Sequence, residues 1–263
     1  MSDQQDSNWQ PTQVVSNNRK LSKASLLNIV LIILTFGLVV SQILMSQRID
    51  NLQSSTAEPS LFRAPDDVQA LVKQVGDSVV DISCENSGGG TGFAFDDDPV
   101  TEGYQTTLVT NYHVIDKCWE NELEVTVLIG PDLTTQVKGL IVSVDEENDL
   151  ALIEIVEKVV PIKSTNDFAE PGWWSMAIGN PYDEDLEESL YRYVSIGYIG
   201  YVYDARYNYT SAVLNRGNSG GPLVNSRGEL IGINTLASSG IDYGIWNIAV
   251  DSDVLCEKLY DCS

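Results

Sequence analysis

The chain contains a single histidine, His113, among its 263 residues, and its four cysteines include no CxxC pair. Zinc sites in proteins are built mainly from Cys and His ligands at short, regular spacings. One histidine and four cysteines without that spacing give little basis for a metal centre. We therefore expect no bound metal ion and no other cofactor.

Basic residues are also scarce. Lysine and arginine together number 15 against 38 aspartates and glutamates, which gives a net charge of −23 at pH 7. Proteins that bind nucleic acid need clustered Lys and Arg to neutralise phosphates, so we expect no nucleic acid partner. The negative charge could steer basic peptides towards a cleft or serve solubility alone. Charge runs usually face solvent, which favours the second interpretation.

Internal repeats and long amphipathic helices are absent from the sequence after residue 45. Short segments rich in Val and Ile follow one another, separated by Gly, Asn and Asp, and this pattern is typical of an all-β fold. One short helix is expected in "DDVQALVKQV", where acidic residues precede apolar positions at helical spacing. It would lead into a first strand, "SVVDISC".

The one long hydrophobic run is Leu26–Met45, with no charge between Lys23 and Arg48. A helix needs about 20 apolar residues to cross a bilayer. A cleaved signal peptide is the alternative, but its apolar core would be shorter and would end in a small-residue cleavage motif. No such motif follows Met45. We therefore predict a transmembrane helix over residues 26–45 that attaches the chain to a membrane.

The charges around this run predict its orientation. Arg19, Lys20 and Lys23 precede the run closely, whereas only Arg48 follows it closely. The positive-inside bias favours a cytoplasmic N-terminus and an extracytoplasmic body, at a cell surface or in a periplasm. We expect residues 1–25 to form a cytoplasmic tail and residues 46–65 a stalk or linker.

All four cysteines lie beyond the hydrophobic run: Cys84, Cys118, Cys256 and Cys262. An even number of cysteines outside the membrane is typical of disulfide bonds in an oxidising compartment. Four cysteines permit three pairings, and the sequence alone does not choose among them. Four reduced, buried thiols are the alternative interpretation.

The stretch "RGNSGGPLVN", residues 216–225, places Ser219 among three glycines. Glycine is unfavourable in ordinary strands, so the cluster indicates unusual backbone angles or the close approach of another molecule. Acyl transfer at a carbonyl requires both an exposed serine and backbone N–H groups that converge on the developing oxyanion. This chemistry also needs a histidine and a carboxylate.

His113, in "LVTNYHVID", is the only candidate base, because an imidazole is the usual partner of a nucleophilic serine. Among the carboxylates, Asp149 immediately precedes the strand-like run Leu150–Ile155. Most aspartates beside strands only cap or turn the chain. Asp145, four residues earlier, remains the competing candidate.

His113, Asp149 and Ser219 occur in the chain order of the chymotrypsin-like arrangement, which differs from the subtilisin and α/β-hydrolase orders. Five segments follow one another along the chain: "GGGTGFAF", "TNYHVI", "NDLALIEI", "AIGNPY" and "GNSGGPLVNSRGELIGIN". In them the chain resembles the protease domain of the HtrA (Deg) family of trypsin-like serine peptidases, from about Val68 to Val250. The resemblance implies His113 as general base, Asp149 as its orienting partner and Ser219 as nucleophile.

The resemblance also implies a fold and an organisation. We expect an all-β domain over residues 66–255 with two antiparallel six-stranded barrels, about 68–160 and 170–250, and the site between them. Residues 256–263 would form a C-terminal tail. Family members usually carry a PDZ domain and often form trimers; only 13 residues follow Val250, so we expect no PDZ domain, and a homotrimer is possible.

One disulfide of chymotrypsin-like proteases straddles the histidine loop, and by this likeness we favour the pairs Cys84–Cys118 and Cys256–Cys262. The resemblance places the oxyanion hole at the backbone N–H groups of Gly217 and Ser219. Its expected substrate pocket is formed by residues near Ser219: Val213, Leu214, Arg216, Asn234, Thr235 and Leu236. No aspartate occupies the place that would select Arg or Lys, so the pocket should accept aliphatic side chains.

The leading hypothesis is a membrane-anchored, extracytoplasmic serine endopeptidase that cleaves unfolded or exported polypeptides. The alternative is a binding or sensor module on a protease fold, with a latent or unused site. All three catalytic positions are filled, which favours the enzyme.

Overall fold

The computed structural model describes residues 23–54, 60–85, 88–96, 99, 101–165, 167–183, 188–240 and 244–260. The chain divides into two compact units, Met1–Ala57 and Glu58–Ser263. We describe each unit by itself.

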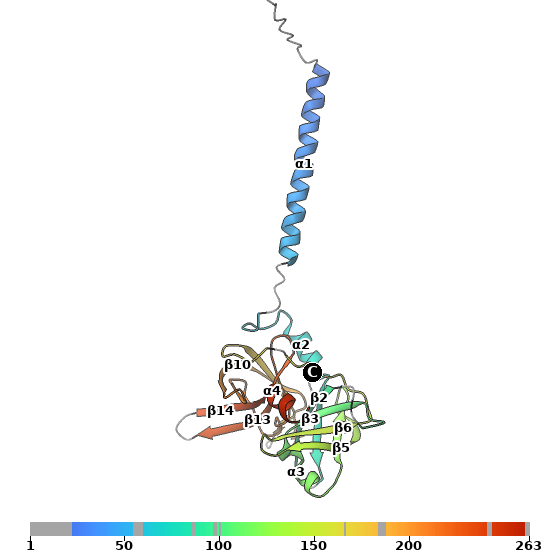
Figure 1. Cartoon of the computed structure of the whole chain (residues 1–263), viewed down its shortest axis with the longest axis vertical. Helices are drawn as coiled ribbons and strands as arrows, with labels where there is room; N and C mark the ends of the chain where they lie inside the picture. The colour runs from blue at the N-terminus through green and yellow to red at the C-terminus, as the bar shows by residue number, and fades with distance from the viewer. Residues whose placement is uncertain are drawn as a thin grey trace, which may run out of the picture. The chain divides into compact units, whose positions relative to one another are not determined.

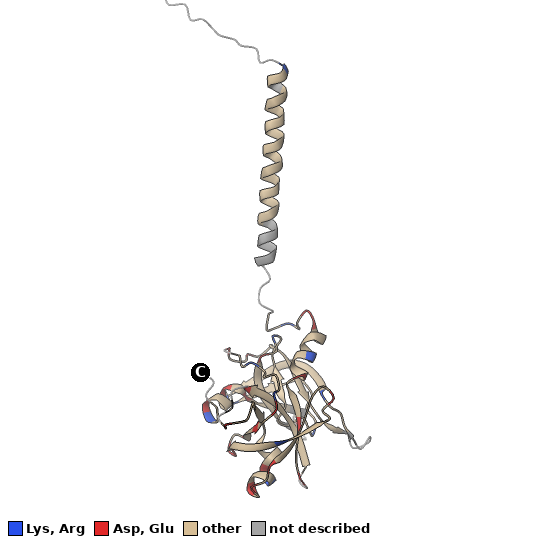
Figure 2. Cartoon of the chain, turned by 90° about the vertical axis from the view of Figure 1, so that its right-hand side faces the viewer, with Lys and Arg blue, Asp and Glu red and all other residues tan. Residues whose placement is uncertain are grey.

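The first unit consists of the helix α1, Lys23–Ser54. Its segment Lys23–Gln47 contains an 18-residue window with a mean hydropathy of 2.5 and is long and apolar enough to cross a membrane. In Figure 2 the helix is blue at its start, where the sequence has Lys23, and tan along the rest of its coloured length. A helix of this kind is compatible with a membrane span or a signal sequence.

Two closed antiparallel barrels of six strands each form the second unit (Figure 1). The first barrel has the strand order β1-β2-β3-β6-β5-β4. Its strands are β1 (Val79–Cys84), β2 (Gly88–Asp96), β3 (Thr106–Thr110), β4 (Val125–Ile129), β5 (Thr135–Asp145) and β6 (Leu150–Ile155).

The second barrel has the order β10-β11-β14-β13-β12-β7. Its strands are β7 (Trp174–Gly179), β10 (Tyr193–Tyr203), β11 (Tyr207–Thr210), β12 (Pro222–Val224), β13 (Leu230–Gly240) and β14 (Gly244–Asp251). The prediction of an all-β fold with two six-stranded barrels is confirmed. The acidic segment after β7 contains a further two-stranded sheet of β8 (Tyr182–Asp183) and β9 (Glu188–Ser189).

Alternation of side chains along the strands explains how the barrels close and pack. In β1, Val80 and Ile82 are fully buried in the core of the first barrel, whereas Asp81 lies on the opposite face and is partly exposed. In β6 both faces are buried. Ala151 and Ile153 enter the barrel core, and the alternate residues enter a second core.

That second core lies between the two barrels. It combines Phe93 and Leu152 of the first barrel with Trp174 and Ile233 of the second, and all four side chains are buried. Burial of apolar area contributes about 25 cal/mol per Å². The two barrels are thus held together by a continuous hydrophobic cluster, which fixes the relative position of the loops at their junction.

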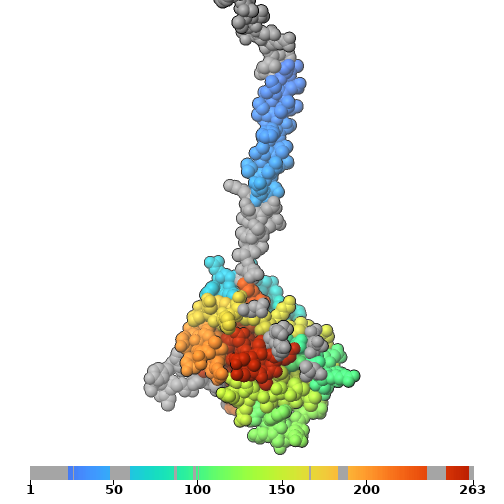
Figure 3. Space-filling model, in the orientation of Figure 1, coloured from blue at the N-terminus to red at the C-terminus, as the bar shows by residue number. Residues whose placement is uncertain are grey.

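Three short helices accompany the barrels: α2 (Val68–Gly76), α3 (Tyr112–Glu120) and α4 (Ser252–Lys258). The predicted helix before the first strand is present as α2, and its N-cap Asp67 accepts a hydrogen bond from the Ala70 N–H. Figure 3 shows α4 in red on the surface between strands of both barrels. Tyr260, just after α4, contacts the Phe95 ring of the first barrel.

Candidate active site

Ser219 lies in a glycine-rich loop that leads into β12. Gly217 and Gly220 have φ angles of 95° and 83°, in the left-handed region that favours glycine. A Cβ on Gly217 would lie 2.5 Å from the Asn180 carbonyl oxygen, and one on Gly220 would collide with Thr110 and Thr91. The glycines are therefore required both by the backbone angles and by close contacts, which Gly217 makes with the segment after β7 and Gly220 with the first barrel.

The peptide between Arg216 and Gly217 is oriented by a backbone hydrogen bond. Its carbonyl oxygen accepts from the Tyr182 N–H at 3.2 Å. Because a trans peptide directs its C=O and N–H to opposite sides, the Gly217 N–H points away from Tyr182. Within the described part of the chain, neither this N–H nor that of Ser219 has a hydrogen-bond acceptor. Two unpaired donors beside a serine can bind an oxyanion.

Thr91 of β2 ties this loop to the first barrel. Its N–H donates to the Ser219 carbonyl at 2.9 Å, and its hydroxyl donates to the Gly217 carbonyl at 2.6 Å. The same hydroxyl accepts from the Asn180 N–H at 2.8 Å, and the Thr91 carbonyl accepts from the Thr110 hydroxyl. Thr91 is fully buried. One residue thus fixes two carbonyls of the loop that carries the serine, one through its backbone N–H and one through its hydroxyl.

His113 is the second residue of α3 and its side chain is about half exposed. The ring Nδ1 lies 2.8 Å from Asp149 Oδ2 and 3.0 Å from Oδ1. The backbone N–H of His113 donates to Asp149 Oδ1 at 2.9 Å. Because Nδ1 contacts the carboxylate, the other ring nitrogen, Nε2, can take part in proton transfer in the cavity that His113 lines with Ser219.

Asp149 occupies a strained backbone position, with φ 56°, at the start of β6. The Asn111 side chain donates to its carbonyl at 2.8 Å, and the Thr235 hydroxyl donates to its Oδ2 at 2.6 Å. Asp145 has a different role, because both of its carboxylate oxygens accept from Asn148 within the turn. Of the two candidate carboxylates, Asp149 is the one that contacts the histidine.

The contact between His113 and Asp149 shifts the pKa values of the two side chains in opposite directions. The hydrogen bond to Asp149 raises the pKa of His113 above its usual value of 6.5, against the effect of partial burial. Burial acts to raise the pKa of Asp149, but the hydrogen bonds from the His113 ring, Thr235 and the His113 backbone together lower it. The carboxylate is therefore ionised at neutral pH and stabilises a charged imidazole.

The Ser219 hydroxyl donates to the Thr235 carbonyl at 3.2 Å and forms no hydrogen bond with His113. Transfer of its proton to the histidine requires rotation about the Cα–Cβ bond. Catalytic hydrogen bonds often tighten only when substrate is bound, so this arrangement is compatible with a serine nucleophile.

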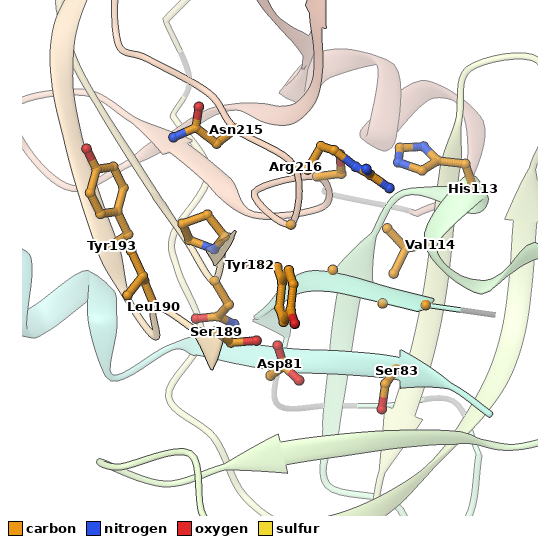
Figure 4. A pocket seen from close by; sticks show the side chains of 17 residues that line it. Asp81, Ser83, His113, Val114, Tyr182, Ser189, Leu190, Tyr193, Asn215 and Arg216 are labelled. Atoms are coloured by element: carbon orange, nitrogen blue, oxygen red, sulfur yellow. The ribbon is translucent and has the colours of Figure 1, made fainter. Parts of the chain in front are cut away.

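A cavity of about 1030 Å³ opens beside Ser219 and is drawn in Figure 4. Its walls come from β1, β2, the start of α3, the segments 180–182 and 189–193 and the loop 215–219. Arg216, one of the expected substrate-binding residues, lines it. Among the described residues, no group of three His, Cys, Asp or Glu side chains could hold a metal ion.

Of the other residues expected in the substrate pocket, Val213, Leu214, Asn234 and Thr235 do not line this cavity. Val213 is 51% exposed, Leu214 belongs to the core of the second barrel, and the buried Asn234 side chain donates to the Pro222 carbonyl. Thr235 serves the Asp149 carboxylate instead of a pocket wall. The Leu236 side chain lies outside the described part of the structure.

Cys84 of β1 and Cys118 of α3 form a disulfide, the pairing that the resemblance led us to expect. It joins the strand that borders the cavity to the helix that carries His113. Cys262 lies outside the described residues, and so does its expected pairing with Cys256.

Two residues of the site were not found from the sequence. Thr91 stands between glycines in "GGGTGFAF", and Asp81 is the one charged residue of "VVDISC". A polar residue between glycines and a lone charge in an apolar strand are the signals that could have indicated them.

Comparison with known proteins agrees with this geometry. The family model of the trypsin-like peptidase domain matches residues 90–233. The protein named "Probable periplasmic serine endoprotease DegP-like" from Chlamydia muridarum is 36% identical over 161 residues, which cover 57% of this chain and 29% of that protein. "Serine protease HTRA1A" from Danio rerio is 34% identical over 171 residues, 59% of this chain and 32% of that protein.

A serine endoprotease from Yersinia pestis has a similar solved structure. The TM-score is 0.60 at 27% sequence identity, and the match covers 74% of this chain and 66% of the other. This chain spans about a third of the length of the two relatives above.

Proposed function

This chain belongs to the trypsin-like peptidase family, and from that premise we propose that it is a membrane-anchored serine endopeptidase that cleaves unfolded or exported polypeptides outside the cytoplasm. The observation that carries the proposal is the pair of backbone N–H groups at Gly217 and Ser219, unpaired within the described structure, in a cavity that His113 also lines.

In this proposal Ser219 Oγ attacks the carbonyl carbon of the scissile peptide bond while His113 Nε2 accepts its proton. The carbonyl oxygen becomes an oxyanion that receives hydrogen bonds from the Gly217 and Ser219 N–H groups. His113 then donates the proton to the leaving amine, and the acyl group stays on Ser219. Water, deprotonated by His113, releases the acyl group and restores the serine.

Asp149 keeps His113 in the tautomer that this sequence requires, with the proton on Nδ1 and Nε2 free to accept. The hydrogen bonds at Nδ1 and at the backbone N–H of His113 support this role. Thr235 supports it as well, because its hydroxyl donates to the same carboxylate. A neutral acceptor in place of Asp149 would lose the stabilisation of the imidazolium.

We also propose that the enzyme prefers substrates with an aliphatic side chain on the residue before the scissile bond. Val213 and the segment around Thr235 would contact this side chain, and neither carries a carboxylate. A basic side chain placed there would leave its charge unpaired in an apolar environment, which costs several kcal/mol. Burial of an aliphatic side chain contributes about 0.8 kcal/mol per CH₂.

Reaction with a fluorophosphonate probe tests the function directly. We expect the full chain in detergent to be labelled on Ser219 and the variant Ser219→Ala to be unlabelled. Ser83→Ala is the matched control, because Ser83 lines the same cavity and should leave labelling intact. An unlabelled parent protein would contradict the endopeptidase proposal.

The second candidate function is a binding or sensor module whose site is latent. The observation in its favour is the Ser219 hydroxyl, which donates to Thr235 and not to His113. Labelling separates the two functions, because a latent serine reacts with the probe no faster than Ser219→Ala. An increase in labelling on addition of an unfolded polypeptide would identify a switched enzyme.

The membrane anchor and its orientation belong to the same proposal. The apolar helix Lys23–Gln47 and the basic residues that precede it support a single span with the N-terminus in the cytoplasm. The full chain should stay in membranes after an alkaline carbonate wash, whereas a chain that starts at Glu58 should be released. Degradation of the second unit by protease added to cells with an opened outer envelope and an intact inner membrane would support the orientation, and its protection would reverse it. Homotrimer formation can be measured on the same preparation.

A further inference from the structure

Ser219 lines the cavity together with residues of β1, β2 and the segments on either side of β8 and β9. None of Val213, Leu214 or Thr235 lines it. If the substrate residues before the scissile bond contact Val213 and Thr235, the residues after the bond enter the cavity. This inference therefore rests on the proposed endopeptidase function and concerns the leaving-group side of the substrate.

Asp81 brings a negative charge into this cavity. The alternation in β1 directs Val80 and Ile82 into the barrel core and Asp81 to the opposite face, which borders the cavity. Asp81 is the only carboxylate among the described residues that line it. Figure 4 draws Asp81 in the region of Ser189 and Tyr182, well away from Arg216, which lies towards His113.

The position of Asp81 is tied to the loop that carries the nucleophile. The Asn180 side chain, which donates to the Val80 carbonyl at 3.0 Å, lies beside its carboxylate and lowers the carboxyl pKa. The Asn180 backbone N–H donates to the Thr91 hydroxyl at 2.8 Å, and that hydroxyl donates to the Gly217 carbonyl at 2.6 Å. These contacts link Asn180, the neighbour of the carboxylate, with Gly217, whose N–H would hold the oxyanion.

The charge of Asp81 is not compensated within the described structure. No Lys, Arg or His side chain forms an ion pair with it there. Burial raises the pKa of Asp81 to about 6, although the hydrogen bond from Asn180 acts in the opposite direction. The group is therefore mostly ionised at pH 7 to 8, partly removed from water and without a cation.

We propose that Asp81 forms a subsite for a lysine or arginine side chain located one or two residues after the scissile bond. An ammonium or guanidinium group that enters the cavity gains a charge-assisted hydrogen bond from a carboxylate that is already partly desolvated. The neighbouring groups on that side, Ser189 and Tyr182, are neutral and can accept further hydrogen bonds. The enzyme would then select an aliphatic residue before the cut and a basic residue after it.

Two peptides that differ at one position test the subsite. Both peptides carry valine directly before the scissile bond. At the tested position after the bond, one peptide has lysine and the other has glutamine. At pH 8 we expect kcat/KM of the full chain to be at least about tenfold higher for the lysine peptide than for the glutamine peptide. A close charge pair has an effect of this size. The variant Asp81→Asn keeps the shape of the side chain, and the ratio of its kcat/KM values for the two peptides should fall to about one.

Glu146→Gln is the control for the general attraction of basic peptides to an acidic protein. Glu146 is exposed, lies in the turn between β5 and β6 and does not line the cavity, so its removal should leave the ratio unchanged. A ratio near one in the parent protein, or an unchanged ratio in Asp81→Asn, overturns the subsite while cleavage itself still supports the endopeptidase. If the parent protein cleaves neither peptide and does not react with the fluorophosphonate, both proposals fall together.

Discussion

The carboxylate of Asp149 bonds His113 at the ring and at the backbone simultaneously, with 2.8 Å to Nδ1 and 2.9 Å to the backbone N. A ring held at one atom can still swing about its side-chain bonds, but here the carboxylate and the start of α3 are fixed to each other. The geometry sets both the tautomer and the direction of the imidazole.

Asp149→Asn should leave the fold intact and lower kcat by several orders of magnitude, about 10⁴ by analogy with the triad of another serine protease. The amide would favour the tautomer with the proton facing the serine. Asp145→Asn is the matched control, because Asp145 bonds only Asn148 in the turn and should retain most activity. A greater loss of kcat in Asp145→Asn than in Asp149→Asn would contradict the assignment.

The pKa of His113 can be measured without ambiguity, because the chain has one histidine and hence one set of ring proton signals. The hydrogen bond to Asp149 raises this pKa, so the NMR titration midpoint should lie above 6.5 and fall in Asp149→Asn. A base must be neutral to accept a proton, so kcat/KM should rise with pH through the same midpoint. A midpoint below 6.5 in the parent protein would show that burial outweighs the hydrogen bond.

Thr91→Val removes the hydroxyl that bonds the Gly217 carbonyl and the Asn180 N–H but keeps the shape of the side chain. Each unpaired group costs about 1–3 kcal/mol, and the loop that supplies the oxyanion donors loses a fixed point. We expect kcat to fall at least about tenfold with a smaller change in KM. Thr91→Ser keeps the hydroxyl and should restore kcat. Equal kcat in the valine and serine variants would leave Thr91 with a packing role only.

The disulfide between Cys84 and Cys118 closes a segment with a sequence separation of 34. A disulfide that closes a loop of this length stabilises a folded protein by about 2–4 kcal/mol, mainly because it lowers the conformational entropy of the unfolded chain. Replacement of both cysteines by alanine should therefore lower the melting temperature, and peptides of the unreduced protein should contain the cross-link by mass spectrometry. Four free thiols in protein from its native membrane would refute the pairing and weaken the extracytoplasmic assignment.

Much of the fold could be predicted because its signals are local. The hydrophobic run of α1, the capping aspartate of α2 and the short Val/Ile-rich strands all depend on neighbours in the chain. The six-stranded barrels came from the resemblance, since no local pattern specifies which strands pair. The helix α3 around His113 was not predicted, and its "YHVIDKCWE" pattern is too short to be separated from a strand end.

The features of the site also divide into those that local sequence indicates and those that depend on distant parts of the chain. The glycines around Ser219 indicate unusual backbone angles by their residue type alone, and Gly217 and Gly220 do adopt them. Which aspartate meets the histidine could not be read from the sequence. Asp145 and Asp149 lie in the same turn, and only the antiparallel pairing of β3 with β6 brings Asp149 to the start of α3.

By itself the sequence determined the residue types of the site, the order of its parts and the places where the chain needs glycine, because these depend on side-chain chemistry and on local backbone energies. Tertiary structure decided what those residues contact. Thr91 bonds Gly217 from 126 positions away, and Thr235 bonds Asp149 across 86. Such pairs form only when two barrels pack through a shared core, so the N–H donors beside Ser219 and the cavity that Asp81 enters are properties of the folded chain.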